Sequence, residues 1–189
     1  MLRSHLDPDD LIQDAAEGRC VLTDAELRFV LEHVAAAGFD PHARERVRGR
    51  LAGMTWRGAI LRGRDRLPPA EVKFLAHVVA KREWPEGTDP IGYLESLGLV
   101  ILDARNGVFT CRYQGTTQLG VVRESGALRG PDGGEWILIE YRAERRHWVT
   151  AFQPGTGLSY LNDPGRSDFR WLRQPEHSSE RPRSFGPSG

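Results

Sequence analysis

The chain has almost no cysteine, very little lysine and no long apolar run. Its only two cysteines, Cys20 and Cys111, lie far apart, and neither belongs to a Cys-x-x-Cys pair. This arrangement favours two free, buried thiols in a reducing compartment over a disulfide framework or a zinc site. No stretch approaches the roughly 20 apolar residues of a membrane-spanning helix, and the N-terminus lacks the apolar core of a signal peptide. We therefore expect a cytoplasmic protein with no membrane partner.

An excess of one charge is absent as well. The 26 basic residues are balanced by 26 acidic ones, which argues against a protein that coats nucleic acid. Only Lys73 and Lys81 are lysines, so the other 24 basic residues (26 − 2) are arginines. Genomic base composition explains this bias, since Ala, Gly and Leu are also abundant. The bias predicts that phosphate contacts and ion pairs are made by arginine, in bidentate geometry.

Familiar metal-binding and nucleotide-binding motifs are missing. The 6 histidines show no His-x3-His or His-Glu-x-x-His spacing, so we expect no metal site and no cofactor. The absence of Gly-x-x-x-x-Gly-Lys and Gly-x-Gly-x-x-Gly excludes nucleotide binding of those kinds. Asp103 and Glu140 resemble part of a metal-dependent nuclease core, but an arginine stands where that core has a lysine.

Helix signals dominate the first hundred residues. Asp-Pro steps at 7–8, 40–41 and 89–90 each supply an N-cap and a proline suited to the first helical position. Residues 23–26 form a capping box, and the prolines at 68–69 open a further helix. These starts predict five helices, which end at Gly18, at Gly38, at Gly53, before Pro85 and at Gly98.

From Leu99 the apolar period changes from 3.6 to 2, which indicates strands separated by turn sequences. The predicted strands cover 108–113, 118–123, 135–142 and 147–152, with a short fifth over 158–161. The predicted fold is α+β, with an N-terminal helical half packed on one face of a four- or five-stranded antiparallel sheet. The expected divisions are a helical region over 1–98, a sheet domain over 99–173 and a disordered tail over 174–189.

The hairpin of residues 135–152 is the most informative segment for function. A turn centred on residues 144–145 places Arg142 opposite His147, Tyr141 opposite Trp148 and Glu140 opposite Val149. Alternation then gives an apolar face that should pack on the helices and a mixed face that should lie open to solvent. The apolar face has Ile137, Ile139, Tyr141, Trp148, Thr150 and Phe152, and the mixed face has Trp136, Leu138, Glu140, Arg142, His147 and Val149.

The mixed face suits acid–base chemistry on a phosphodiester. An imidazole at His147 can move a proton, the carboxylate of Glu140 can act as its counterpart, and Arg142 can hold a phosphate. Cleavage of RNA through its own 2′-hydroxyl needs these roles and no metal. The same trio also fits an ordinary cross-strand ion pair on a solvated face. Further phosphate, base or stacking contacts are expected from Arg112, Tyr113, Arg123 and Trp136.

The order of elements over residues 94–161 resembles the end of small ribonuclease toxins. A helical segment precedes a short meander, an alternating strand, a basic turn and the run His147-Trp-Val-Thr-Ala-Phe-Gln-Pro. This pattern is similar to the barnase, colicin D and RelE-like group. The resemblance implies metal-independent cleavage of RNA on an open sheet face, with a cognate inhibitor protein as partner. By position it implies catalytic roles for His147, Thr150, Arg112 and Glu140, although this chain is neutral rather than basic.

Two alternatives belong to other classes of protein. The third predicted helix carries Arg44, Arg46, Arg48 and Arg50 and follows a capped helix and a glycine turn, as in a helix-turn-helix. This favours a non-catalytic module that binds nucleic acid or a protein, although the same arginines fit a solvated helix balanced by acidic residues. A protein-interaction adaptor with neither activity is the second alternative.

Overall fold

The computed structural model describes residues 7–39 and 69–176, and within them the helices precede the strands. The helical elements are α1 (Pro8–Ala16), α2 (Asp24–Ala37), α5 (Pro69–Phe74), the π-helix η2 (Leu75–Ala80) and α6 (Pro90–Leu102). The strands are β1 (Gly107–Tyr113), β2 (Thr116–Glu124), β3 (Trp136–Arg142), β4 (His147–Phe152) and β5 (Arg166–Arg173). The 3-10 helices η3 (Gly126–Leu128), η4 (Ala143–Arg145) and η5 (Gly157–Asn162) lie between strands. The α+β class predicted from the sequence is confirmed.

The predicted helix starts are confirmed where the structure describes them. Asp7 caps α1 by accepting a hydrogen bond from the Asp9 amide at 3.0 Å, and Asp89 caps α6 by accepting one from the Gly92 amide at 2.7 Å. Thr23 and Glu26 form the predicted reciprocal capping box at the start of α2. The third predicted helix, with Arg44, Arg46, Arg48 and Arg50, lies outside the described residues.

Two helix predictions need correction. The helix predicted to close at Gly98 continues to Leu102, because Val100 and Ile101 are buried and extend the apolar stripe. The side-chain Nδ2 of Asn106 then donates to the Val100 and Ile101 carbonyls at 3.1 and 2.6 Å, which ends the helix. The helix predicted before Pro85 is present, but its second half widens into η2.

All neighbouring strands pair antiparallel, in the spatial order β4-β3-β2-β1-β5. The short strand predicted over 158–161 is wrong, since those residues belong to η5, whose first residue, Gly157, has a left-handed φ of 59°. The fifth strand is instead β5, in which Asp168 has a left-handed φ of 52° and the pairing with β1 shifts register. These irregularities and the strand's charged residues hide the alternation that a sequence pattern requires.

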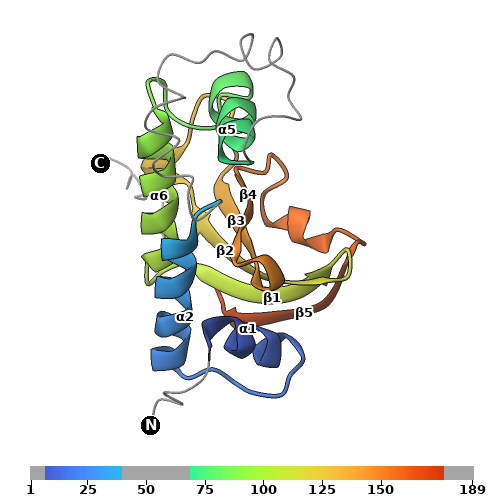
Figure 1. The fold of residues 1–189 in the computed structure, drawn as a ribbon. Coiled ribbons are helices and arrows are strands. Elements are labelled where there is room, and N and C mark those ends of the chain that lie inside the picture. The colour runs from blue at the N-terminus through green and yellow to red at the C-terminus, as the bar shows by residue number, and fades with distance from the viewer. Residues whose placement is uncertain (1–6, 40–68, 177–189) are drawn as a thin grey trace, which may run out of the picture.

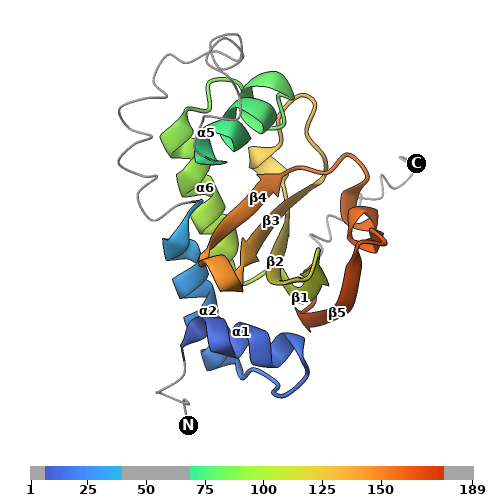
Figure 2. The same ribbon diagram turned by 45° about the vertical axis from the view of Figure 1, so that its right-hand side comes forward.

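The sheet lies between two unequal layers (Figures 1 and 2). Helices α1, α2, α5 and α6 cover one face, which we call the helix face, and its core includes Leu31, Leu97, Ile139 and Trp148. The opposite face, which we call the second face, was expected to be open, but η5 and side chains of the edge strand β5 cover much of it. Its smaller core consists of Phe109, Cys111, Val122, Trp136 and Leu138, with Phe152, Leu158, Tyr160, Leu161, Phe169 and Trp171 packed around them.

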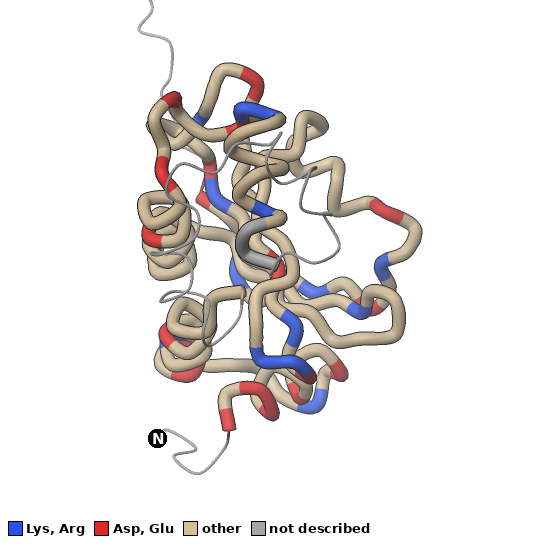
Figure 3. Tube along the Cα trace, turned by 45° about the horizontal axis from the view of Figure 1, so that its top comes forward, with Lys and Arg blue, Asp and Glu red and all other residues tan. Residues whose placement is uncertain are grey.

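Charged residues of both signs are spread along the described chain, as Figure 3 shows. Within the described ranges, no helix has the length and apolar character that crossing a bilayer requires.

Candidate functional site

The hairpin register agrees with the prediction at its turn and departs from it one pair later. Arg142 pairs with His147 and Tyr141 with Trp148, as expected, but Glu140 pairs with Thr150 rather than with Val149. The shift makes Val149 the extra residue of a β-bulge, which reverses the direction of the following side chains. The prediction that Thr150 and Phe152 face the helices is therefore wrong. Thr150 lies opposite Glu140, and Phe152 packs in the core of the second face.

Glu140 lies on the predicted face, but it is buried. Its side chain is 6% exposed and forms an ion pair with Arg166 of β5, whose side chain is 2% exposed. The Arg166 guanidinium lies 5.2 and 5.5 Å from the ring centres of Tyr113 and Tyr160. Burial raises the pKa of Glu140, and the charge of Arg166 opposes that rise. The expectation of a solvent-reachable carboxylate at Glu140 is corrected, because the Arg166 side chain, from a strand distant in sequence, covers it.

The Phe109 ring lies over Gly120, next to the ion pair. Phe109 pairs with Gly120, which pairs in turn with Glu140. A Cβ at Gly120 would overlap the Phe109 ring, so only glycine admits the ring in this position. Arg166 lies 6.0 Å from the centre of that ring. The row Phe109, Gly120, Glu140 and Thr150 thus crosses the second face from β1 to β4.

The trio predicted from the hairpin does not assemble into one site. Glu140, Arg142 and His147 share a face, but in the described part of the chain no hydrogen bond or ion pair joins two of them. His147 is half-buried, and its Nδ1 lies 2.8 Å from the Arg145 carbonyl oxygen at the turn. The imidazole therefore interacts with the turn rather than with the carboxylate.

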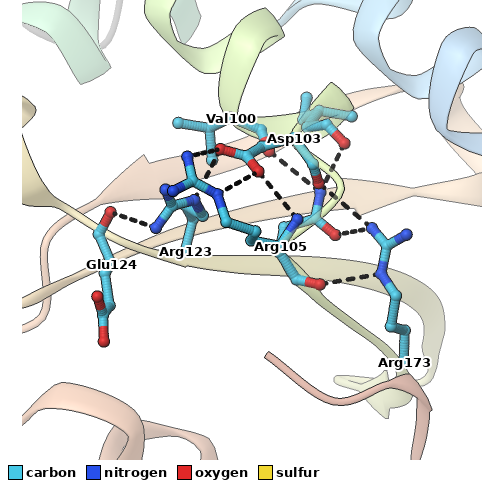
Figure 4. Close-up of polar contacts among 8 residues, drawn as sticks. Val100, Asp103, Arg105, Arg123, Glu124 and Arg173 are labelled. Atoms are coloured by element: carbon cyan, nitrogen blue, oxygen red, sulfur yellow. Dashed lines mark hydrogen bonds and ion pairs between the residues drawn. The ribbon is translucent and has the colours of Figure 1, made fainter. Parts of the chain in front are cut away.

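Two predicted substrate contacts belong to the helix face. Arg112 pairs with Thr117, and Arg123 pairs with Ile137. By alternation along the strands, these side chains point to the sheet face opposite to that of Glu140. Arg123 donates from Nε to the Asp103 carboxylate at 2.9 Å, and Arg105 binds the same carboxylate at the end of α6 (Figure 4). Hydrogen bonds from Arg105 above all hold the pKa of Asp103 well below its usual range. This network joins α6 to β2, and within it the Arg123 guanidinium binds Asp103.

The two aromatic residues expected to bind bases lie on the second face and are covered. Trp136 is 7% exposed within the small core, so its ring offers no free stacking surface. Tyr113 is half-buried beneath the Arg166 guanidinium. The segment after β4 therefore buries Trp136 and leaves Tyr113 partly exposed.

A cavity of about 380 Å³ lies between η2 and the edge strand β4, on the side of the second face. Lys73, His77 and Lys81 follow one another at four-residue spacing along the helical segment and line this cavity together. We call it the lysine pocket, because it contains both lysines of the chain. The complete lining is Val72, Lys73, Ala76, His77, Lys81, Thr150, Phe152 and Tyr160.

His77 is held against a buried carboxylate. Its Nδ1 lies 3.0 Å from Oε2 of Glu83, and the two side chains are 9% and 6% exposed. The backbone amide of Gln153 donates to the same Oε2 at 2.9 Å, and Lys81 Nζ lies 3.7 Å from Oε1. The imidazole also stacks on Phe152, with ring centres 5.4 Å apart. The Lys81–Glu83 contact corrects the expectation that ion pairs are made by arginine.

Chemically, the lysine pocket combines an acid–base group with anion-binding groups. A carboxylate that accepts from Nδ1–H leaves the other ring nitrogen as the base, and two ammonium groups supply compact positive charge. The hydroxyls of Thr150 and Tyr160 add donors, and burial raises the pKa of Tyr160, so its hydroxyl stays protonated. Lys73 also lowers the pKa of Glu140 by its charge, although the burial of Glu140 outweighs this effect.

The lysine pocket was missed by the sequence reasoning, which interpreted residues 69–84 as a helix with one apolar stripe. The available signal was the scarcity of lysine itself. In a chain with 26 basic residues, both lysines flank one histidine at four-residue spacing. His77 and Glu83 are six positions apart, which no regular helical spacing would bring together.

Comparison with family models, with curated proteins and with solved structures found no match for this chain. The described residues contain no group of three or more His, Cys, Asp and Glu side chains arranged to hold a metal ion.

Proposed function

We propose that this protein is a toxin-like, metal-independent endoribonuclease of the cytoplasm, with its active site in the lysine pocket rather than at His147. The observation that carries the proposal is that both lysines and the carboxylate-paired His77 line one cavity. The resemblance of the hairpin to ribonuclease toxins supplies the substrate class. The bulge that brings Thr150 to this cavity agrees with the role that the resemblance implies for it.

The proposed reaction is an attack by the RNA on itself. His77 takes the proton of the 2′-hydroxyl, and the freed oxygen forms a bond to phosphorus. The bond from phosphorus to the 5′-oxygen breaks, and that oxygen takes a proton from a lysine ammonium group of the pocket. The products are a 2′,3′-cyclic phosphate and a free 5′-hydroxyl. Lys73 and Lys81 lie beside His77 and stabilise the negative charge of the phosphorane.

This arrangement also indicates where a cognate inhibitor protein must bind. An inhibitor of this enzyme has to prevent the RNA phosphate from reaching the two ammonium groups. Carboxylates presented to the lysine pocket would do so by charge complementarity. The alternative of a binding module built on the arginines of residues 44–50 concerns residues outside the described structure.

The decisive experiment is RNA cleavage by the purified protein in the presence of a chelator. His77→Ala is expected to reduce the cleavage rate by roughly 10²–10⁴-fold, the usual contribution of a general base. The matched controls are His33→Ala and His147→Ala, which are expected to retain the rate. Replacing both lysines by arginine should also lower the rate, because the larger planar group does not reproduce a compact ammonium charge.

Two results would contradict the proposal. Full activity of His77→Ala would remove the lysine pocket from the reaction. Loss of activity in His147→Ala alone would return the active site to the hairpin turn. Cyclic phosphate ends on the products distinguish the proposed reaction from hydrolysis by an activated water.

A further inference from the structure

The backbone between η2 and Trp84 is held in two uncommon conformations. The Lys81 amide donates to the Ala76 carbonyl at 3.0 Å, five residues back, which is the hydrogen-bond pattern of a π-helix. Arg82 then has a left-handed φ of 52°, a conformation that side-chain-bearing residues adopt at an energetic cost. Such features persist where the surrounding structure compensates for them, and they cluster at functional sites.

Together these two features return the chain onto His77. The Glu83 amide donates to the His77 carbonyl at 2.9 Å, so residue 83 lies directly beneath residue 77. A regular α-helix would carry these two side chains onto different faces, because six residues correspond to one and two-thirds turns. The widened turn and the left-handed residue are therefore what bring the Glu83 carboxylate to Nδ1 of the imidazole.

The rest of the fold holds Glu83 in place from two further sides. The Gly130 amide donates to the Glu83 carbonyl at 2.7 Å, and the Gln153 amide donates to its carboxylate at 2.9 Å. A Cβ at Gly130 would overlap the backbone of residues 82–84, so the loop before β3 packs directly on this turn. The carboxylate is thus fixed by the helical segment, by the loop before β3 and by the residue after β4.

We propose that Glu83 is the positioning residue of this site. Its carboxylate accepts a hydrogen bond from Nδ1–H of His77, which selects one tautomer and leaves Nε2 as the nitrogen that takes a proton. The catalytic consequence of this role rests on the proposed endoribonuclease function, whereas the tautomer does not. A pair with a purely structural role would favour the same tautomer, but removing the charge of Glu83 would then leave kcat unchanged.

The tautomer can be read directly by nitrogen NMR of the full chain labelled at histidine, at a pH where the rings are neutral. We expect His77 to carry its proton on Nδ1. His33 provides an internal control in the same spectrum, because its Nε2 lies 3.0 Å from the Tyr141 hydroxyl and 3.3 Å from Asp9. His33 is therefore expected to carry its proton on Nε2. A proton on Nε2 of His77 in the unmodified protein would overturn the proposal, and this measurement requires no variant to fold.

The kinetic test uses Glu83→Gln and Glu83→Asp. The first keeps the size of the side chain and removes its charge, and we expect it to lower kcat for RNA cleavage by about 10²–10⁴-fold with little change in KM. The second keeps the charge and should restore part of the rate. Full activity of Glu83→Gln would refute the positioning role and leave the proposed function standing. If His77 has the expected tautomer but the protein cleaves no RNA, the proposed function is refuted and the orientation of His77 by Glu83 stands.

Discussion

Two histidines contact buried carboxylates on opposite faces of the same sheet, and their surroundings differ. On the helix face, His33 of α2 contacts Asp9 of α1 and the hydroxyl of Tyr141 on β3. That hydroxyl donates to Asp9 at 2.7 Å, and Arg146 lies 3.1 Å from the same carboxylate. On the second face, His77 contacts Glu83 beside a cavity that also holds Lys73 and Lys81.

The comparison shows that a histidine–carboxylate pair alone does not indicate a catalytic site. The His33 network joins two helices to the hairpin, and burial raises the pKa of its tyrosine well above the usual range. Its groups contact one another. The His77 pair differs in lining a cavity with cationic side chains, so a ligand can meet the imidazole there. The two histidine sites therefore differ in the cavity beside the histidine–carboxylate pair, not in the pair itself.

The largest expected effect concerns the buried charges of the second face. Arg166→Met leaves the Glu140 carboxylate buried without its cation, and we expect a loss of about 3–5 kcal/mol in the free energy of unfolding. The double variant Glu140→Leu with Arg166→Met should lose much less stability, since it contains no buried charge without a partner at this position. Urea unfolding of the three proteins measures this.

The pH dependence of the Arg166→Met variant sharpens the same test. Burial already raises the pKa of Glu140, so the folded protein favours the protonated carboxyl. Without Arg166 that preference increases, and ionisation of Glu140 costs more stability as the pH rises above the pKa of an unfolded glutamate, about 4.3. The loss in Arg166→Met should therefore be larger at pH 8 than at pH 5. Equal losses would show that the ion pair contributes little.

A smaller effect is expected from Tyr141→Phe on the helix face. The substitution removes the hydroxyl that donates to Asp9 and leaves a buried carboxylate oxygen short of one donor, which costs about 1–3 kcal/mol. RNA cleavage by this variant should be unchanged. If Tyr141→Phe lost RNA cleavage without losing stability, the His33 network would take part in the reaction, and the contrast drawn between His33 and His77 would be wrong.

The smallest expected effect is at Asp103, where Arg105 and Arg123 hold the end of α6 against β2. The pKa of Asp103 is depressed in the folded protein, so its stabilisation is present above the pKa of an unfolded aspartate, about 3.9, and is lost as the pH falls. Asp103→Asn should cost up to about 1 kcal/mol at pH 7, since solvent screens the contact with the exposed Arg105. Thermal unfolding at pH 7 and pH 3 tests this, and an equal cost at both values would contradict the assignment.

Several features of the fold were predictable from short-range signals. The caps at Asp7, Thr23 and Asp89 depend on hydrogen bonds within one turn of helix, and the sequence shows both partners of each bond. Arg142–His147 and Tyr141–Trp148 were predictable because the pairs nearest a turn follow from its position. The candidate site was not predictable in this way, since it joins residues 73–83 to β4 and to the segment after β4.

The sequence by itself determined the helix starts and the first four strands, and it determined the face of the hairpin on which Glu140, Arg142 and His147 lie. Capping and alternation act between residues a few positions apart, so a linear pattern contains them. The tertiary structure decided that β5 covers Glu140, that Val149 bulges and brings Thr150 to the lysine pocket, and that Glu83 returns to His77. Each of these depends on packing between distant segments, where a local irregularity is stable only because the rest of the fold compensates for it.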